Sequence, residues 1–176
     1  MPKLNRLDMW TEQLDLPGYE VVNEQQDRPT DPVVLTLLST ARVTHCPHCG
    51  RPSESVHVNR NSAPYRDLSH GKFNIHLIIH ARQFHCGHCN RYFTPTCPYL
   101  VEGIHATERF LEQAARLIRF SDIANVADFL DVPEKTLSRW YYAYIGRPTQ
   151  QPPTPLQPIK SIGIDELSLK KSTVSS

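Results

Sequence analysis

Two cysteine pairs constrain the fold of this chain more than any other feature of its sequence. Residues 45–50 read H-C-P-H-C-G and residues 85–90 read H-C-G-H-C-N, with 36 residues between Cys49 and Cys86. A C-x₂-C turn directs both thiolates to one centre, and two such turns supply four soft ligands for a tetrahedral zinc ion. The sequence therefore predicts one structural zinc ion, bound by Cys46, Cys49, Cys86 and Cys89.

Other uses of the five cysteines fit the sequence less well. A redox C-x₂-C motif usually occurs singly, and a disulfide framework belongs to a secreted domain. The chain has neither the apolar N-terminal stretch of a signal peptide nor a run of about 18 apolar residues that would span a bilayer. His48 and His88 lie inside the two turns and are alternative ligands, although four thiolates already complete a site. Cys97 has no partner at ligand spacing, so we expect a packed free thiol.

The basic residues and the histidines are concentrated in the middle of the chain. Residues 1–40 carry three basic and seven acidic side chains, whereas residues 41–105 carry seven basic, three acidic and all nine histidines. A basic segment favours a polyanionic partner such as nucleic acid. An excess of this size is also common on proteins without such a partner.

The segment before the first cysteine pair predicts a helix and a hairpin. Apolar residues recur at helical spacing over residues 3–14, and the Pro-Gly pair at 17–18 ends this helix with a turn. Residues 19–23 and 33–40 are rich in β-branched side chains and flank a polar turn, so they predict two paired strands.

The segment between the cysteine pairs predicts a small sheet. Apolar and polar residues alternate over residues 73–82, as in a half-buried strand, and residues 56–59 and 65–68 are shorter strand candidates. A sheet of this size depends on the metal for its stability. Its basic side chains would line either a phosphate-facing surface or an ordinary solvated face. They are Arg60, Arg66, Lys72, Arg82 and Arg91, together with His76 and His80.

The periodicity becomes helical after residue 107. The pattern predicts helices over residues 107–120, 122–130 and 134–144, with Ser121 as the N-cap of the second and Asp122 as its first-turn acid. The last two have the spacing of a helix-turn-helix, although Asp131 stands where the turn usually has glycine. The N-terminal part of the third helix would then read the DNA major groove. The side chains predicted to face outward there are Lys135, Thr136, Ser138, Arg139 and Tyr142. A three-helix bundle without a role in DNA binding is the alternative.

The end of the sequence contains a linker and an acidic strand. Residues 146–158 hold five prolines, which predicts an extended and semi-stiff segment. Residues 161–169 read S-I-G-I-D-E-L-S-L, an apolar strand pattern that includes Asp165 and Glu166.

The order of these parts resembles the N-terminal part of bacterial insertion-sequence transposases of the ISL-three family. The matching stretches are residues 16–19, 46–50, 66–68, 86–93 and 164–166, reading L-P-G-Y, C-P-H-C-G, R-D-L, C-x₂-C-x-R-x-F and I-D-E. The resemblance implies that the zinc ribbon and the helix-turn-helix bind double-stranded DNA at the terminal inverted repeats. It also implies a bacterial cytoplasmic protein at the nucleoid, with no membrane partner, and leaves a homodimer open.

The resemblance also implies a role for Asp165, as the first of three metal-binding acids in an RNase-H-like catalytic domain. Two-metal phosphoryl transfer needs several carboxylates around ions about 3.5–4 Å apart. Glu166 adjoins Asp165 on a strand, so it points to the opposite face and cannot complete the site. We therefore expect a truncated transposase that binds DNA without cutting it. Magnesium would serve only a full-length transposase.

These inferences combine into one predicted α+β architecture. It has an N-terminal helix and β-hairpin over residues 1–44, a zinc-ribbon sheet over 45–100, a three-helix helix-turn-helix domain over 104–145, a Pro-rich linker over 146–160, and a truncated catalytic strand over 161–176. The alternative from another functional class is a zinc-ribbon module that binds a protein partner or regulates one. Steeply salt-dependent binding to duplex DNA would distinguish the two functions.

Overall fold

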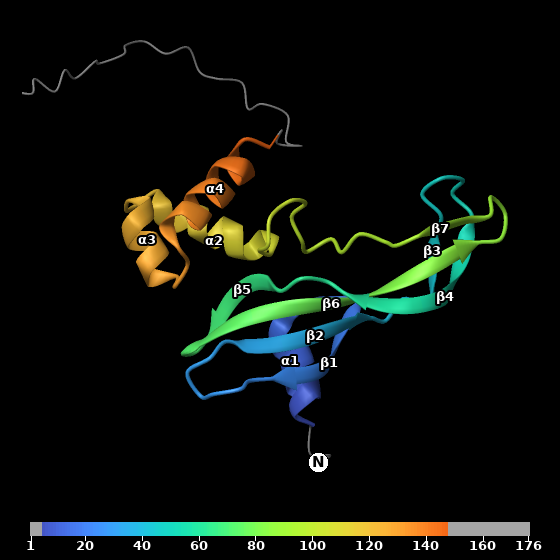
Figure 1. Cartoon of the computed structure of the whole chain (residues 1–176), viewed down its shortest axis with the longest axis horizontal. Helices are drawn as coiled ribbons and strands as arrows, with labels where there is room; N and C mark the ends of the chain where they lie inside the picture. Colours follow the sequence, from blue (N-terminus) through green and yellow to red (C-terminus); the bar gives the residue numbers. More distant parts are fainter. Residues whose placement is uncertain (1–4, 148–176) are drawn as a thin grey trace, which may run out of the picture. The chain divides into compact units, whose positions relative to one another are not determined.

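A computed structural model describes residues 5–147, apart from the side chains of residues 55–60, and has the predicted mixed α+β composition (Figure 1). The strands are β1 (Tyr19–Gln25), β2 (Val33–Ser39), β3 (Val43–His45), β4 (Pro52–Asn61), β5 (Tyr65–His70), β6 (Phe73–Cys86) and β7 (Arg91–Phe93). The helices are α1 (Arg6–Leu14), α2 (Glu108–Ile118), α3 (Ile123–Phe129) and α4 (Glu134–Ile145). None of these helices has the length and apolar character needed to cross a bilayer.

Strand β6 is the centre of the sheet. The hairpin of β1 and β2 is antiparallel, as predicted, and β2 then pairs in parallel with the first half of β6, with Val33 opposite Ile75. Strands β4, β5 and β7 each pair with β6 in the antiparallel sense, and β3 pairs with β4 (Figure 1). The N-terminal hairpin and the zinc-ribbon strands therefore share one sheet, a pairing for which the sequence contains no signal.

Helix α1 closes the core on the first half of the sheet. Trp10 and Leu14 are buried against alternate residues of β2 and β6, among them Leu35 and Leu77. The strand residues between them, such as Thr36 and Ile78, are only half-buried. The alternation predicted for residues 73–82 is thus confirmed, because one face of the strand is covered by the helix and the other is not.

The second half of β6 buries the opposite face. Ile75, Leu77 and Ile79 are buried in the first half of the strand. After a half-buried stretch over residues 80–83, the buried residues are Phe84 and Cys86. Because successive side chains of a strand point to opposite faces, a change from odd to even numbers is a change of face. The core beneath α1 and the core of the zinc ribbon consequently lie on opposite faces of one continuous strand.

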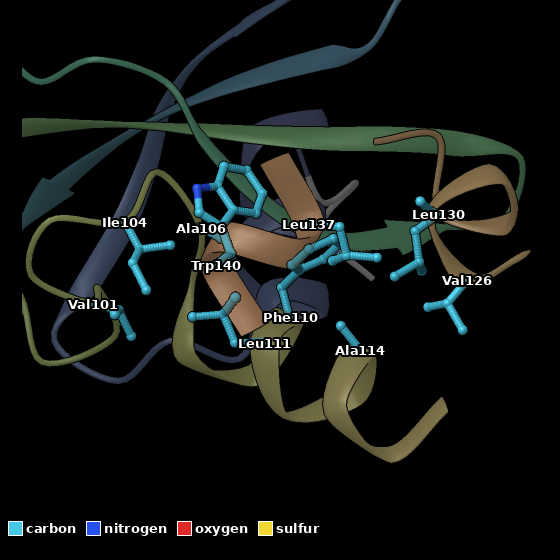
Figure 2. Close-up of a cluster of buried hydrophobic side chains, with 11 residues drawn as sticks. Val101, Ile104, Ala106, Phe110, Leu111, Ala114, Val126, Leu130, Leu137 and Trp140 are labelled. Carbon is cyan, nitrogen blue, oxygen red and sulfur yellow. The ribbon is translucent and has the colours of Figure 1, made fainter. Parts of the chain in front are cut away.

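Helices α2, α3 and α4 lie where the sequence predicted them and have a core of their own. Figure 2 shows Phe110 and Leu137 between Trp140 on one side and Val126 with Leu130 on the other. The N-cap of α3 is Asp122 and not the predicted Ser121, because the Asp122 carboxylate accepts a hydrogen bond of 2.8 Å from the backbone N–H of Asn125.

Asp131 between α3 and α4 has φ 52°, the left-handed conformation that glycine adopts most easily. An Asp tolerates this conformation better than most other residues. The backbone N–H of Val132 bonds to the carbonyl of Ala127 at 3.0 Å and closes the turn. The absence of glycine therefore does not prevent a tight turn between the two helices.

The Pro-rich linker and the predicted strand over 161–169, including Asp165, fall outside the described residues apart from 146 and 147. Their predicted structure stays a prediction, as do the domain boundaries.

Candidate metal centre and nucleic-acid interface

The two C-x₂-C turns have the same backbone geometry. The backbone N–H of Gly50 bonds to the carbonyl of Cys46 at 2.8 Å, and the N–H of Asn90 bonds to the carbonyl of Cys86 at 2.8 Å. Gly50 and Asn90 both have positive φ, at 70° and 54°. A left-handed residue after each pair turns the chain back, so both thiols point inward. Glycine and asparagine are residue types that adopt this conformation readily.

The four thiols form one cluster with the dimensions of a zinc site. All four Sγ atoms lie within 4.8 Å of one another, and the Cys46–Cys89 and Cys49–Cys86 pairs are 3.6 and 3.5 Å apart. Zinc–sulfur bonds of about 2.3 Å in a tetrahedron place the sulfurs about 3.8 Å from one another. The residues therefore fit a structural zinc ion, with the ligand set that the sequence predicted.

The protein environment spreads the pKa values of these thiols. Hydrogen bonds, first from the Ser53 hydroxyl and then from backbone amides, lower the pKa of Cys86 to about 5. Burial and then the neighbouring sulfur of Cys46 raise the pKa of Cys89 to about 12. The backbone N–H of Arg51 lowers the pKa of Cys49, but burial and neighbouring sulfurs leave it above its ordinary value. One zinc ion stabilises all four groups as thiolates together.

A small apolar core supports the cluster. Phe84 and Phe93 stack with ring centroids 5.8 Å apart and pack with the buried thiols of Cys46 and Cys86. Phe93 comes from β7, which starts directly after the second cysteine pair. Among the side chains that the structure describes, this core consists of two rings and the cysteines themselves, so its stability depends on the metal.

The remaining candidate ligands lie outside the sulfur cluster. His48 is exposed, and its Nδ1 lies 3.3 Å from Nη1 of Arg91. His88 is exposed as well. Cys97 is half-buried against the core beneath α1, as expected for a packed free thiol.

The structure divides the predicted cationic residues of the ribbon. Arg91 is exposed at the start of β7, where the contact with His48 links the two cysteine turns. Arg82 is half-buried on β6. Arg66 is a correction, because it is only 5% exposed and its guanidinium lies 5.5 Å from the ring centroid of Phe110. A guanidinium covered in this way cannot contact a phosphate.

Helix α4 presents two different faces. Leu137 and Trp140 are buried in the helical core, while Lys135, Arg139 and Tyr142 are exposed. These three lie at i, i+4 and i+7, which places them along one face of the helix. Thr136 and Ser138 are half-buried beside them.

Sequence reasoning missed the groups that join the sheet to the helices. The buried carboxylate of Asp67 on β5 accepts hydrogen bonds from the hydroxyl of Thr107 at 2.7 Å and from Nε of Arg109 at 2.8 Å. The backbone of Arg66 also bonds to residues 105 and 107, which extends the sheet by a short parallel bridge. The R-D-L stretch at residues 66–68 was the only hint of this connection that the sequence analysis noted. The hydrogen-bond partners of Asp67 lie about 40 residues further along the chain, beyond the reach of a local pattern.

Comparison with known proteins agrees with this geometry. Residues 42–89 match the family model of the zinc-finger of transposase IS204/IS1001/IS1096/IS1165, and the match includes all four cysteines. No curated protein and no solved structure shows a significant match to the chain. Residues 42–89 are therefore a zinc ribbon of the ISL-three transposase type, in agreement with the resemblance to the N-terminal part of these enzymes.

Proposed function

We propose that this protein is a transposase-related DNA-binding module that recognises duplex DNA at the terminal inverted repeats of an insertion sequence. The observation that carries the proposal is a zinc ribbon of the transposase type in the same chain as a helix with an exposed basic face. Zinc ribbons and helix-turn-helix units both hold side chains rigidly enough to contact phosphates and base edges.

Helix α4 is the proposed reading helix. Its buried residues hold it against α2 and α3, so Lys135, Arg139 and Tyr142 keep a defined direction. Arginine and lysine suit guanine edges and phosphates, and tyrosine suits the sugar-phosphate backbone. Thr136 and Ser138 contribute short hydroxyl donors near the start of the helix.

The zinc ribbon is the proposed second contact. Arg91 and Tyr92 are exposed directly after the second cysteine pair, and the ring of His85 packs 4.6 Å from the ring of Tyr92. These groups suit a phosphate backbone, which requires charge and donors but no base-specific geometry. Arg82 is the further proposed phosphate contact, from the half-buried part of β6.

A salt-titrated binding assay tests the proposal. Zinc-loaded protein is titrated against a fluorescent duplex carrying the repeats that flank its reading frame, at several salt concentrations. For each phosphate contact, the logarithm of the binding constant falls with the logarithm of salt by a slope of about 0.9. Lys135→Ala and Arg91→Ala should each reduce this slope by about one if they remove a phosphate contact. Arg139→Ala should cost about 1–3 kcal/mol on the preferred duplex if Arg139 reads a base.

Arg28→Ala is the charge-matched control, because Arg28 is exposed in the acidic N-terminal hairpin. Unchanged affinity and salt dependence in all three test variants would exclude these residues from the interface. Binding that is absent or insensitive to salt would exclude DNA as the partner.

The alternative is a protein-interaction module that docks through the helices, including a homodimer. Phe120 and Phe129 favour it, since they are 91% and 75% exposed at the ends of α2 and α3. Phe120→Ser with Phe129→Ser should abolish self-association in analytical ultracentrifugation if this surface is an interface. The same variant should retain DNA binding if α4 and the ribbon are the readers.

A further inference from the structure

Asn74 on β6 connects the sheet to the turn between α3 and α4. Its Nδ2 donates a hydrogen bond of 2.7 Å to the Asp131 carboxylate. Its Oδ1 accepts hydrogen bonds from Nη2 of Arg66 at 2.5 Å and from the hydroxyl of Ser69 at 3.1 Å. Both ends of one amide are therefore occupied, which determines its orientation.

Arg66 makes a second connection to the same turn. Its Nη2 donates a hydrogen bond of 3.0 Å to the backbone carbonyl of Leu130, at the C-terminal end of α3. Such a carbonyl has no partner within the helix, and a positive charge at this end is favourable. Burial lowers the pKa of Arg66, and Asp131 and Asp67 raise it in opposition. Among the described residues, Nε and Nη1 of Arg66 have no hydrogen-bond partner.

The turn itself is held in an uncommon conformation. Asp131 has φ 52° and presents its carboxylate to Asn74, while the preceding residue, Leu130, is bonded to Arg66. Two successive residues of the turn are thus attached to β5 and β6. The position of α4, which begins at Glu134, depends on this turn.

The strand that is hydrogen-bonded to the turn through Asn74 also carries one of the four predicted zinc ligands. Strand β6 runs without interruption from Phe73, next to Asn74, to the zinc ligand Cys86. At a rise of about 3.3 Å per residue, the twelve steps from Asn74 to Cys86 span at most about 40 Å. That length is close to one turn of B-DNA, about 34–36 Å.

We infer that Asn74 and Asp131 are positioning residues that hold α4 in a fixed relation to the zinc ribbon, so that the protein reads DNA as a two-part site of fixed spacing. This inference rests on the proposed DNA-binding function and adds the class of its target. The target is two short recognition segments about one helical turn apart, and a change in the intervening length would misalign one of them.

The test first defines the two-part site. Zinc-loaded wild-type protein selects duplexes from a random library, and hydroxyl-radical footprinting locates the protected segments. Duplexes with one extra base pair, or with about five extra base pairs for half a helical turn, are then made between the segments. We expect each insertion to reduce wild-type affinity by about tenfold, because a rigid protein loses one of its two contacts.

Two variants then test the connection. Asn74→Ala removes both hydrogen bonds of the amide, and Asp131→Gly removes the carboxylate while keeping a residue suited to positive φ. Each variant should bind the selected duplex about tenfold more weakly than the wild type does. An insertion between the segments should then reduce the affinity of the variant by less than about threefold. Each variant should bind either half-duplex with the affinity of the wild type. Asp131→Asn keeps an acceptor for Asn74 and should behave as the wild type. Asn61→Ala, which removes a sheet amide hydrogen-bonded to His80 at 2.6 Å, is the matched control.

Three outcomes would overturn the inference. In the first, the wild type tolerates insertions anywhere in its footprint or protects one uninterrupted segment, and DNA binding then stands without two-part reading. Asn74→Ala and Asp131→Gly could both keep the full insertion penalty, which would assign the rigidity to other contacts. Failure to select any duplex, with binding insensitive to salt, would overturn both this inference and the proposed function.

Discussion

The carboxylate of Asp67 accepts hydrogen bonds from both Nε and Nη2 of Arg109, so that one bidentate ion pair joins β5 to α2. Nη1 of the same guanidinium donates to the carbonyl of Leu14 at 2.5 Å, at the end of α1. Asp67 is fully buried, and its hydrogen bonds raise the pKa of Arg109 further. A single arginine thus connects the N-terminal helix, the sheet and the helical region.

Arg109→Ala should destabilise the protein by about 3–5 kcal/mol, because it leaves the Asp67 carboxylate buried with the Thr107 hydroxyl as its one remaining side-chain hydrogen-bond donor among the described residues. Urea denaturation measures this free energy of unfolding. Arg116→Ala is the control on the same helix, since Arg116 pairs with Glu112 on the exposed surface and should cost less than about 0.5 kcal/mol. Equal losses of unfolding free energy in the two variants would show that the buried ion pair stabilises the protein no more than the exposed one.

Removing zinc should unfold one end of the sheet and spare the other. The Phe84–Phe93 core contains the cysteines themselves, whereas the core beneath α1 contains none of the four ligands. Chelation, or Cys89→Ser, should therefore abolish amide-exchange protection in β3, β4 and β7 while protection persists in β2. Cys97→Ser should bind zinc as the wild type does. Elemental analysis that finds no zinc in protein purified without a chelator would contradict this prediction.

Zinc binding should release protons and strengthen as pH rises. At neutral pH the metal-free thiols of Cys89, with a pKa of about 12, and of Cys49, also raised, are protonated, whereas Cys86, at about 5, is already a thiolate. Zinc binds thiolates, so it must displace the protons of Cys49 and Cys89. Affinity should consequently fall as pH falls, with a further loss near pH 5 as Cys86 becomes protonated. Calorimetry in buffers of different ionisation enthalpy counts the protons, and binding without proton release would refute the assignment.

Ala127→Leu should destabilise the helical core by about 1–3 kcal/mol through overpacking. Ala127 is 2% exposed in the cluster formed by α2, α3 and α4, where a larger side chain has no room. Ala124→Leu is the matched control, because Ala124 is exposed on the same helix. Thermal unfolding of both variants measures the difference. Similar stability for the two would mean that α3 does not pack closely at Ala127.

Local sequence patterns predicted the metal ligands and most of the secondary structure. The repeated C-x₂-C motif predicted the four ligands, because the geometry of each cysteine turn is determined within six residues. Alternation over residues 73–82 predicted the buried face of β6, and helical spacing predicted α1, α2, α3 and α4. The cap of α3, which the structure places at Asp122 one residue after the predicted Ser121, and the left-handed residues Gly50 and Asn90 are equally local. Each of these features depends on interactions within a few residues of the chain.

The tertiary structure decided what these elements contact. The parallel pairing of β2 with β6 involves strands about 40 residues apart, and no local pattern specifies which edge a hairpin will join. The burial of the Arg66 side chain depends on its contacts with Phe110 and Leu130, so a residue predicted to be a surface cation is buried. Charge, periodicity and motif spacing describe a residue's own neighbourhood, whereas burial and ion pairing depend on partners that only the folded chain brings within reach.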